Sequence, residues 1–149
     1  MGDTHGTVRL GAAQVTEVYL DREATIAKDC EYIREAGRKG VDVLVFPEFH
    51  VAGSPYWFQY DDDCEGFQQY YRALFDNAVT VPGPATERLC AAAREAGVAV
   101  VVGVNEKRAG TAGTMYNSQV FVDADGTLLG VRRKLAPTRE ERLYHTGGA

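Results

Sequence analysis

The chain has 149 residues, 45% hydrophobic and 25% charged, which is ordinary for one globular domain with a buried core. Its net charge of −5 argues against nucleic-acid binding, which depends on clustered lysine and arginine. No apolar run approaches the roughly 20 residues that span a bilayer, and no secretory signal opens the sequence, so we expect a cytoplasmic protein that does not bind membranes.

The first part of the chain predicts a strand, a helix and a second strand. Residues 8–15 are typical of a strand, and Asp21 then has the character of a helix N-cap. Small and apolar residues recur at helical spacing at Ile26, Cys30, Ile33 and Gly37. Residues 41–46 are apolar on both faces, which is typical of a parallel strand covered by helices. These patterns predict a βαβ unit.

Two more helices and three more strands are predicted after this unit. The helices are expected at 67–78 and from Pro84 to Gly97, and the strands at 98–104, 115–122 and 128–132. The last two strands flank a glycine-containing turn, which predicts an antiparallel hairpin. The predicted fold is therefore α/β, with a mixed sheet and helices on one of its faces.

Two charged residues follow predicted strands. Glu48 comes directly after the run 41–46, and ligand crevices of open α/β sheets lie beyond the carboxyl ends of their strands. Lys134 follows the hairpin, and at least one of three adjacent cations on a strand must face the interior. An inward lysine near carboxylates would stay charged and could stabilise an anion. The alternatives are a solvated carboxylate at a strand end and a solvated basic patch.

Glu141 lies seven residues beyond Lys134. Thr138 and Glu141 have the spacing of a capping box, so Glu141 can serve a helix start and an active site at once. The segment Tyr116-Asn117-Ser118 lies on the strand that leads to the hairpin. We expect Asn117 to have a structural role in which it satisfies nearby backbone groups.

These motifs resemble the nitrilase branch of the carbon-nitrogen hydrolase superfamily, along nearly the whole chain. Phe46-Pro47-Glu48 is similar to that family's glutamate motif, and residues 133–138 match its Arg-Lys-Leu-x-Pro-Thr pattern. The resemblance implies that Glu48 is the general base and that Glu141, rather than Glu140, is a second active-site glutamate. It also implies two stacked sheets in an α-β-β-α sandwich, of which this chain forms the N-terminal half.

An aromatic segment, Tyr56-Trp57-Phe58, follows the glutamate motif. Tyr56 and Trp57 are candidate substrate-binding residues, and the alternative is that the segment fills the core. Ser54 stands where the family has a tyrosine, which changes the shape of the pocket. The three histidines are too widely spaced for a metal site, and no glycine-rich phosphate loop is present, so we expect no metal and no cofactor.

The three cysteines form no CxxC pair, which suits a reducing compartment. Cys30 and Cys90 lie on predicted helix faces as small hydrophobic residues, and Cys64 lies among carboxylates that disfavour a thiolate. The family's nucleophilic cysteine lies well beyond its lysine. We therefore expect residues 1–149 to be a carbon-nitrogen hydrolase domain truncated before the nucleophile, and inactive alone.

For the complete protein, the resemblance implies hydrolysis of a small-molecule nitrile to a carboxylic acid and ammonia. The reaction would pass through a cysteine thioimidate and a thioester, and the complete protein would be a homo-oligomer. The nearest alternatives are an amidase or a cyanide-degrading member of the same superfamily. A non-enzymatic alternative is a catalytically inactive fragment or subunit.

Overall fold

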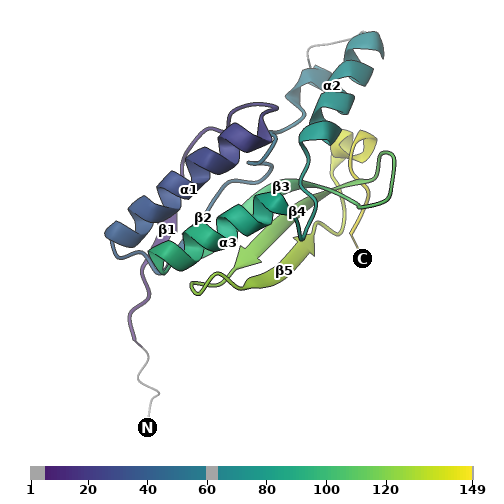
Figure 1. The fold of residues 1–149 in the computed structure, drawn as a ribbon. Helices are drawn as coiled ribbons and strands as arrows, with labels where there is room; N and C mark the ends of the chain where they lie inside the picture. The colour runs from purple at the N-terminus through teal and green to yellow at the C-terminus, as the bar shows by residue number, and fades with distance from the viewer. Residues whose placement is uncertain (1–5, 60–63, 149) are drawn as a thin grey trace.

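The computed structural model describes residues 6–59 and 64–148, which contain a mixed five-stranded sheet (Figure 1). The strands are β1 (Leu10–Ala12), β2 (Val43–Val45), β3 (Ala99–Lys107), β4 (Met115–Val122) and β5 (Leu128–Arg133), and they lie side by side in this order. β1, β2 and β3 are parallel, whereas β4 and β5 continue the sheet antiparallel. The predicted α/β class and mixed sheet are confirmed.

The helices are α1 (Arg22–Arg38), α2 (Cys64–Asn77) and α3 (Pro84–Ala96), with short 3-10 helices η1 (Tyr56–Gln59) and η2 (Arg139–Leu143). The Asp21 carboxylate caps α1 by accepting from the Ala24 N–H at 2.9 Å, as predicted. Gly97 ends α3 in the left-handed conformation, with φ 66°, which glycine adopts without steric cost.

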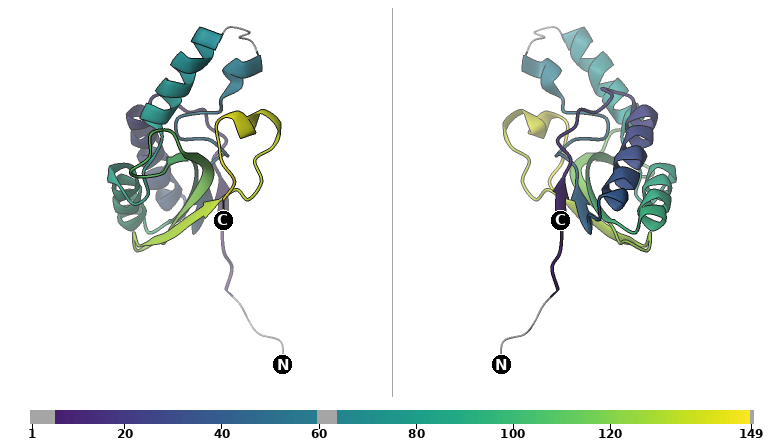
Figure 2. Two further views of the ribbon diagram at one scale, coloured as in Figure 1. Left: turned by 90° about the vertical axis from the view of Figure 1, so that its right-hand side faces the viewer. Right: turned by 90° about the vertical axis from the view of Figure 1, so that its left-hand side faces the viewer.

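Helices α1 and α3 pack side by side on one face of the sheet, and η2 lies on the opposite side (Figure 2). The helix-covered face holds the main core. Its fully buried members include Ile26, Ile33, Leu89, Val100, Val102 and Val120. The opposite face is more open, since Val45 is 39% exposed and Val101 and Phe121 are half-buried. The sheet therefore presents one packed face and one accessible face.

The three parallel strands differ in length from the predicted ones. β1 and β2 are three residues each, shorter than the apolar runs around them. β3 extends to Lys107, because it pairs with β4 continuously from Val100↔Val122 to Lys107↔Met115. The polar end of β3, which the apolar run did not predict, is the part that reaches the charged residues described below.

A second hydrophobic cluster, which contains several aromatic rings, packs against α2. It contains Ala52, Trp57, Leu74, Ala78, Met115 and Tyr144. No helix in the described part of the chain is long and apolar enough to cross a membrane. His5 and the side chains of Phe58 and Cys64 lie outside the described residues, so the expectations for them stay predictions.

Two leucines provide a matched test of this packing. Leu89 is 1% exposed in α3, whereas Leu129 is 63% exposed in β5. We predict that Leu89→Ala lowers the free energy of unfolding of the 149-residue chain by roughly 2–5 kcal/mol. Leu129→Ala should change it by less than about 0.5 kcal/mol. Urea denaturation measures both values, and equal losses would contradict the packing described here.

Candidate active site

Glu48, Lys134 and Glu141 converge on the accessible side of the sheet, although they come from the turn after β2, the end of β5 and η2. The Lys134 Nζ lies 3.1 Å from Glu48 Oε1 and 2.6 Å from Glu141 Oε2. The exposed fraction of the side chain is 59% for Glu48, 31% for Lys134 and 10% for Glu141. One ammonium therefore serves a buried carboxylate and an accessible one.

Asn117 on β4 joins the two carboxylates directly. Its Nδ2 donates to Glu48 Oε1 at 2.6 Å and to Glu141 Oε1 at 2.9 Å. The expectation that this side chain satisfies backbone groups is therefore wrong, since both amide hydrogens serve the acids. The Asn117 backbone oxygen also accepts from the Lys134 N–H at 2.8 Å, which fixes where the lysine leaves the sheet.

Glu141 is held by its own helix start as well. Its Oε2 accepts from the Thr138 N–H at 2.9 Å and from the Thr138 hydroxyl at 2.8 Å. The predicted capping contact is confirmed, with the difference that it starts a 3-10 helix. Glu141 thus starts η2 and at the same time pairs with Lys134, while its neighbour Glu140 is exposed.

The hydrogen bonds set the charges of these groups. Burial alone would raise the pKa of Glu141, but bonds from Lys134, Thr138 and Asn117 outweigh it and lower that pKa to about 2. Burial alone would lower the pKa of Lys134, but bonds to Glu141 and Glu48 raise it above its ordinary value. At neutral pH the site therefore holds a charged ammonium beside an ionised Glu141.

The residue before Lys134 is anchored on the other side of the strand. Arg133 donates three hydrogen bonds to the buried Glu106 carboxylate, from Nη2 to Oε1 at 2.6 Å and from Nε to Oε2 at 3.0 Å and to Oε1 at 3.2 Å. Its guanidinium also lies over the Tyr116 ring, 4.0 Å from the centroid. Because successive strand residues point to opposite faces, this anchor directs Lys134 toward the acids.

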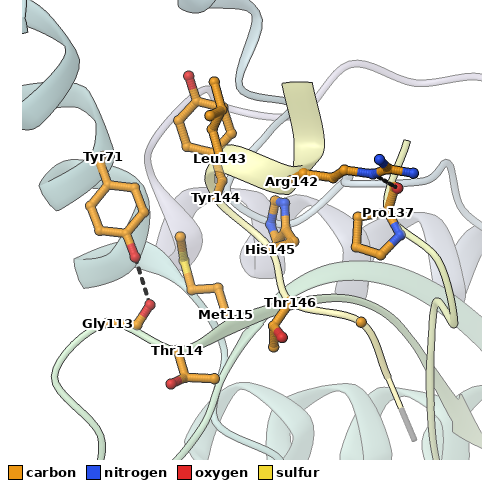
Figure 3. Close-up of a pocket in the computed structure, with 11 residues that line it drawn as sticks. Tyr71, Gly113, Thr114, Met115, Pro137, Arg142, Leu143, Tyr144, His145 and Thr146 are labelled. Carbon is orange, nitrogen blue, oxygen red and sulfur yellow. Dashed lines mark hydrogen bonds between the residues drawn. The ribbon is translucent and has the colours of Figure 1, made fainter. Parts of the chain in front are cut away.

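Two hollows border this region. One of about 480 Å³ is lined by Glu48, Asn117, Ser118, Gln119, Arg132, Arg133, Lys134 and Leu135. The other, of about 570 Å³, lies between α2 and the segment around η2, with His145 and Met115 on its wall (Figure 3). The first hollow is lined by both the general-base candidate Glu48 and Lys134.

The two predicted substrate-binding aromatics lie apart from those hollows. Trp57 is buried in the aromatic cluster, with its ring 5.5 Å from Tyr70 and 5.4 Å from Tyr144. Tyr56 is 58% exposed in η1. Trp57 thus packs in the core of this chain, and a contact between either residue and substrate stays a prediction.

Two histidines are buried near the acids. The His50 Nε2 lies 2.7 Å from the Asp29 Oδ1, and neither side chain is exposed, so α1 is tied to the turn that carries Glu48. The His145 Nε2 lies 2.9 Å from the Asn105 Oδ1. Among the described residues, no group of three or more histidine, cysteine or acidic side chains could hold a metal ion.

Cys30 and Cys90 lie on α1 and α3, the helices that cover the opposite face of the sheet. Burial raises the pKa of both thiols, which disfavours the thiolate. Neither has the setting of a nucleophile for the charged site.

The chain is similar to known proteins along nearly its whole length. Residues 9–149 match the family model for carbon-nitrogen hydrolases. The chain belongs to the carbon-nitrogen hydrolase family. Within this family it lies in the nitrilase branch, since it is 45% identical over 146 residues to "Nitrilase 2" from an unknown prokaryotic organism. It is also 36% identical over 142 residues to an aliphatic nitrilase from Rhodococcus rhodochrous.

This carbon-nitrogen hydrolase chain spans less than half the length of these two relatives. The two matches cover 96% and 95% of the chain but 45% and 38% of the respective relatives. Among solved structures, an amidase from Nesterenkonia sp. has a TM-score of 0.67 at 19% identity, covering 95% of this chain and 48% of the amidase. A carbon-nitrogen hydrolase from Helicobacter pylori G27 has a TM-score of 0.64 at 23% identity, with 95% and 45% covered. These likenesses show the fold, and they fit the predicted N-terminal half of the sandwich.

Burial of His145 gives the hydrolase chain a pH-dependent stability. Burial lowers the pKa of His145 from 6.5 to about 4, so the unfolded chain binds more protons between these values. We predict that the free energy of unfolding falls by on the order of 3 kcal/mol as pH falls from 6.5 to 4. His145→Gln should flatten this part of the profile, as measured by urea denaturation at a series of pH values. An unchanged slope in the variant would show that another group is responsible.

Proposed function

We propose that the complete protein hydrolyses a nitrile to a carboxylic acid and ammonia, with Glu48, Lys134 and Glu141 in its active site. The observation that carries this proposal is the single ammonium within hydrogen-bond distance of two carboxylates. The motifs around these residues and the sequence identity to nitrilases support it. A small-molecule substrate would enter by the hollow beside Lys134.

Each group has a chemical task in this reaction. Glu48, whose carboxylate is accessible, takes the proton of a cysteine thiol, and the thiolate adds to the nitrile carbon. The nitrile nitrogen takes up this proton, which gives the thioimidate and returns Glu48 to its ionised form. Water adds to the thioimidate, the carbon–nitrogen bond breaks, and ammonia leaves a thioester. Glu48 then activates a second water, which releases the carboxylic acid and returns the thiol. Two waters are consumed for each nitrile.

Lys134 stabilises the negative charge that develops on the nitrogen or oxygen atom bonded to the reacting carbon. It can do so because its ammonium is already charged and held in place. Glu141, with its lowered pKa, keeps the ammonium charged and oriented. The nucleophile in this proposal comes from another part of the complete protein, because Cys30 and Cys90 lie in the helix layer and Cys64 follows three aspartates that disfavour a thiolate.

Amide hydrolysis is a second reaction that the same groups can perform. The two relatives at 45% and 36% identity are named nitrilases, whereas the amidase likeness rests on 19% identity and concerns the fold. Nitrile hydrolysis is therefore the proposal, and amide substrates belong in its test.

The proposal can be tested by a chimera that joins residues 1–149 to the remaining carboxyl-terminal part of the prokaryotic "Nitrilase 2". We predict ammonia release from aliphatic or aryl nitriles by the chimera and none by the 149-residue chain alone. Glu48→Gln should lower kcat by roughly 100-fold or more because the base is lost. Lys134→Ala should lower it by about 100–1,000-fold because the positive charge is lost.

Glu140→Gln is the matched control for Glu141→Gln, since Glu140 is exposed and next in sequence. The control should keep near-normal turnover, while Glu141→Gln should not. A folded chimera that releases ammonia only from amides would replace the nitrilase assignment by an amidase one. A folded chimera without either activity would support the non-enzymatic alternative.

A further inference from the structure

Two asparagines face each other on the accessible side of the sheet. Asn105 on β3 is the cross-strand partner of Asn117 on β4, so both side chains leave the same face. Asn117 binds the carboxylates of Glu48 and Glu141 themselves. Asn105 is completely buried, and no sequence motif pointed to it.

Asn105 binds the segments on which the two acids are carried. Its Nδ2 donates to the backbone oxygens of Val51 at 3.0 Å and Gly53 at 2.9 Å. Because both amide hydrogens are used, its Oδ1 is the atom that faces the His145 Nε2, 2.9 Å away. The imidazole must then carry its hydrogen on Nε2, which is the neutral donor form.

The connected segments are close to both acids in sequence and in space. Val51 and Gly53 lie in the turn that begins at Glu48, and the His145 N–H donates to the Glu141 backbone oxygen at 2.7 Å. The rings of Phe49 and His145 also lie 5.3 Å apart, so the two segments touch. From β3, the Asn105 side chain thus binds both the turn after Glu48 and the segment that follows Glu141.

The turn after Glu48 needs such a restraint. Phe49 and Ala52 have φ values of 57° and 78°, in the left-handed region that residues other than glycine rarely adopt. Each such residue costs of order 1 kcal/mol or more, and it persists only where the surroundings hold it. The bonds from Asn105 fall on the two carbonyls at the end of this turn.

We propose that Asn105, acting with His145, is a positioning residue that holds the segments carrying Glu48 and Glu141 at the separation that Lys134 requires. It does not reach the reacting atoms. Its effect on catalysis rests on the proposed function, whereas its effect on the geometry of the three charged groups does not.

The geometric part is tested in the 149-residue chain by the proton-exchange rate of the Lys134 ammonium, measured by ¹⁵N NMR at neutral pH. Hydrogen bonds to both carboxylates slow this exchange. Asn105→Asp has the same shape as asparagine but cannot donate to both carbonyls. It should raise the proton-exchange rate of the Lys134 ammonium about tenfold. This factor is equivalent to the loss of one hydrogen bond of the ammonium, about 1.4 kcal/mol. An unchanged rate in Asn105→Asp would overturn the proposal.

Two controls separate positioning from general stability. Leu89→Ala weakens the fold from the other side of the sheet and should leave the exchange rate of Lys134 unchanged. His145→Gln keeps a donor for Asn105 and should also leave it unchanged, whereas His145→Leu should raise it. Equal rates for His145→Gln and His145→Leu would contradict the proposal even if Asn105→Asp does not fold.

The catalytic part is measured in the chimera. Asn105→Asp should lower kcat on the order of 10–100-fold, with KM changed less than about threefold, since misplaced groups affect the chemical step. If Asn105→Asp raised KM and left kcat unchanged, the positioning function in catalysis would be overturned. If the unaltered chimera does not hydrolyse nitriles, the proposed function fails, and the Lys134 exchange rate still decides the geometric part.

Discussion

The ammonium of Lys134 is shared by two carboxylates, and most of the described site follows from that constraint. Glu141 is nearly buried, and a buried carboxylate is costly unless it is paired and hydrogen-bonded. Lys134 provides the charge, while Asn117 and Thr138 provide further donors. Glu48 completes the arrangement from 86 residues away in sequence. The outcome is one acid fixed in a charged state and another left accessible to solvent.

The sheet makes this meeting possible because its two faces differ. The helix-covered face supplies the hydrophobic core, so the other face can carry polar residues at its end. Space for the Glu48 turn comes from Gly103 on β3, where an added Cβ would lie 2.8 Å from the Glu48 Cα. On the helix side, the buried pair of His50 and Asp29 ties the same turn to α1. The accessible acid is thus placed by contacts on both sides of its turn.

Local patterns predicted much of this fold. The cap at Asp21, the end of α3 at Gly97 and the hairpin turn depend on nearby residues, so each was readable from a short stretch of sequence. Glu48 and Lys134 were found because they follow strands within motifs, and Glu141 because of its capping-box spacing and the family resemblance. Asn105 and the Asp29–His50 pair were missed because their partners are 21 to 54 residues away, and no local pattern marks such contacts. The polar end of β3 was missed for a related reason, since cross-strand pairing rather than an apolar run extends it.

We expect Lys134 and Glu141 to stabilise each other as one charged unit, since Lys134 Nζ lies 2.6 Å from Glu141 Oε2. A double-mutant cycle measures this coupling from the free energies of unfolding of the 149-residue chain, Glu141→Gln, Lys134→Met and the double variant at neutral pH. We predict a coupling energy of about 1 kcal/mol or more between the two positions. Effects that add within about 0.3 kcal/mol would show that the two groups act independently, and would contradict it.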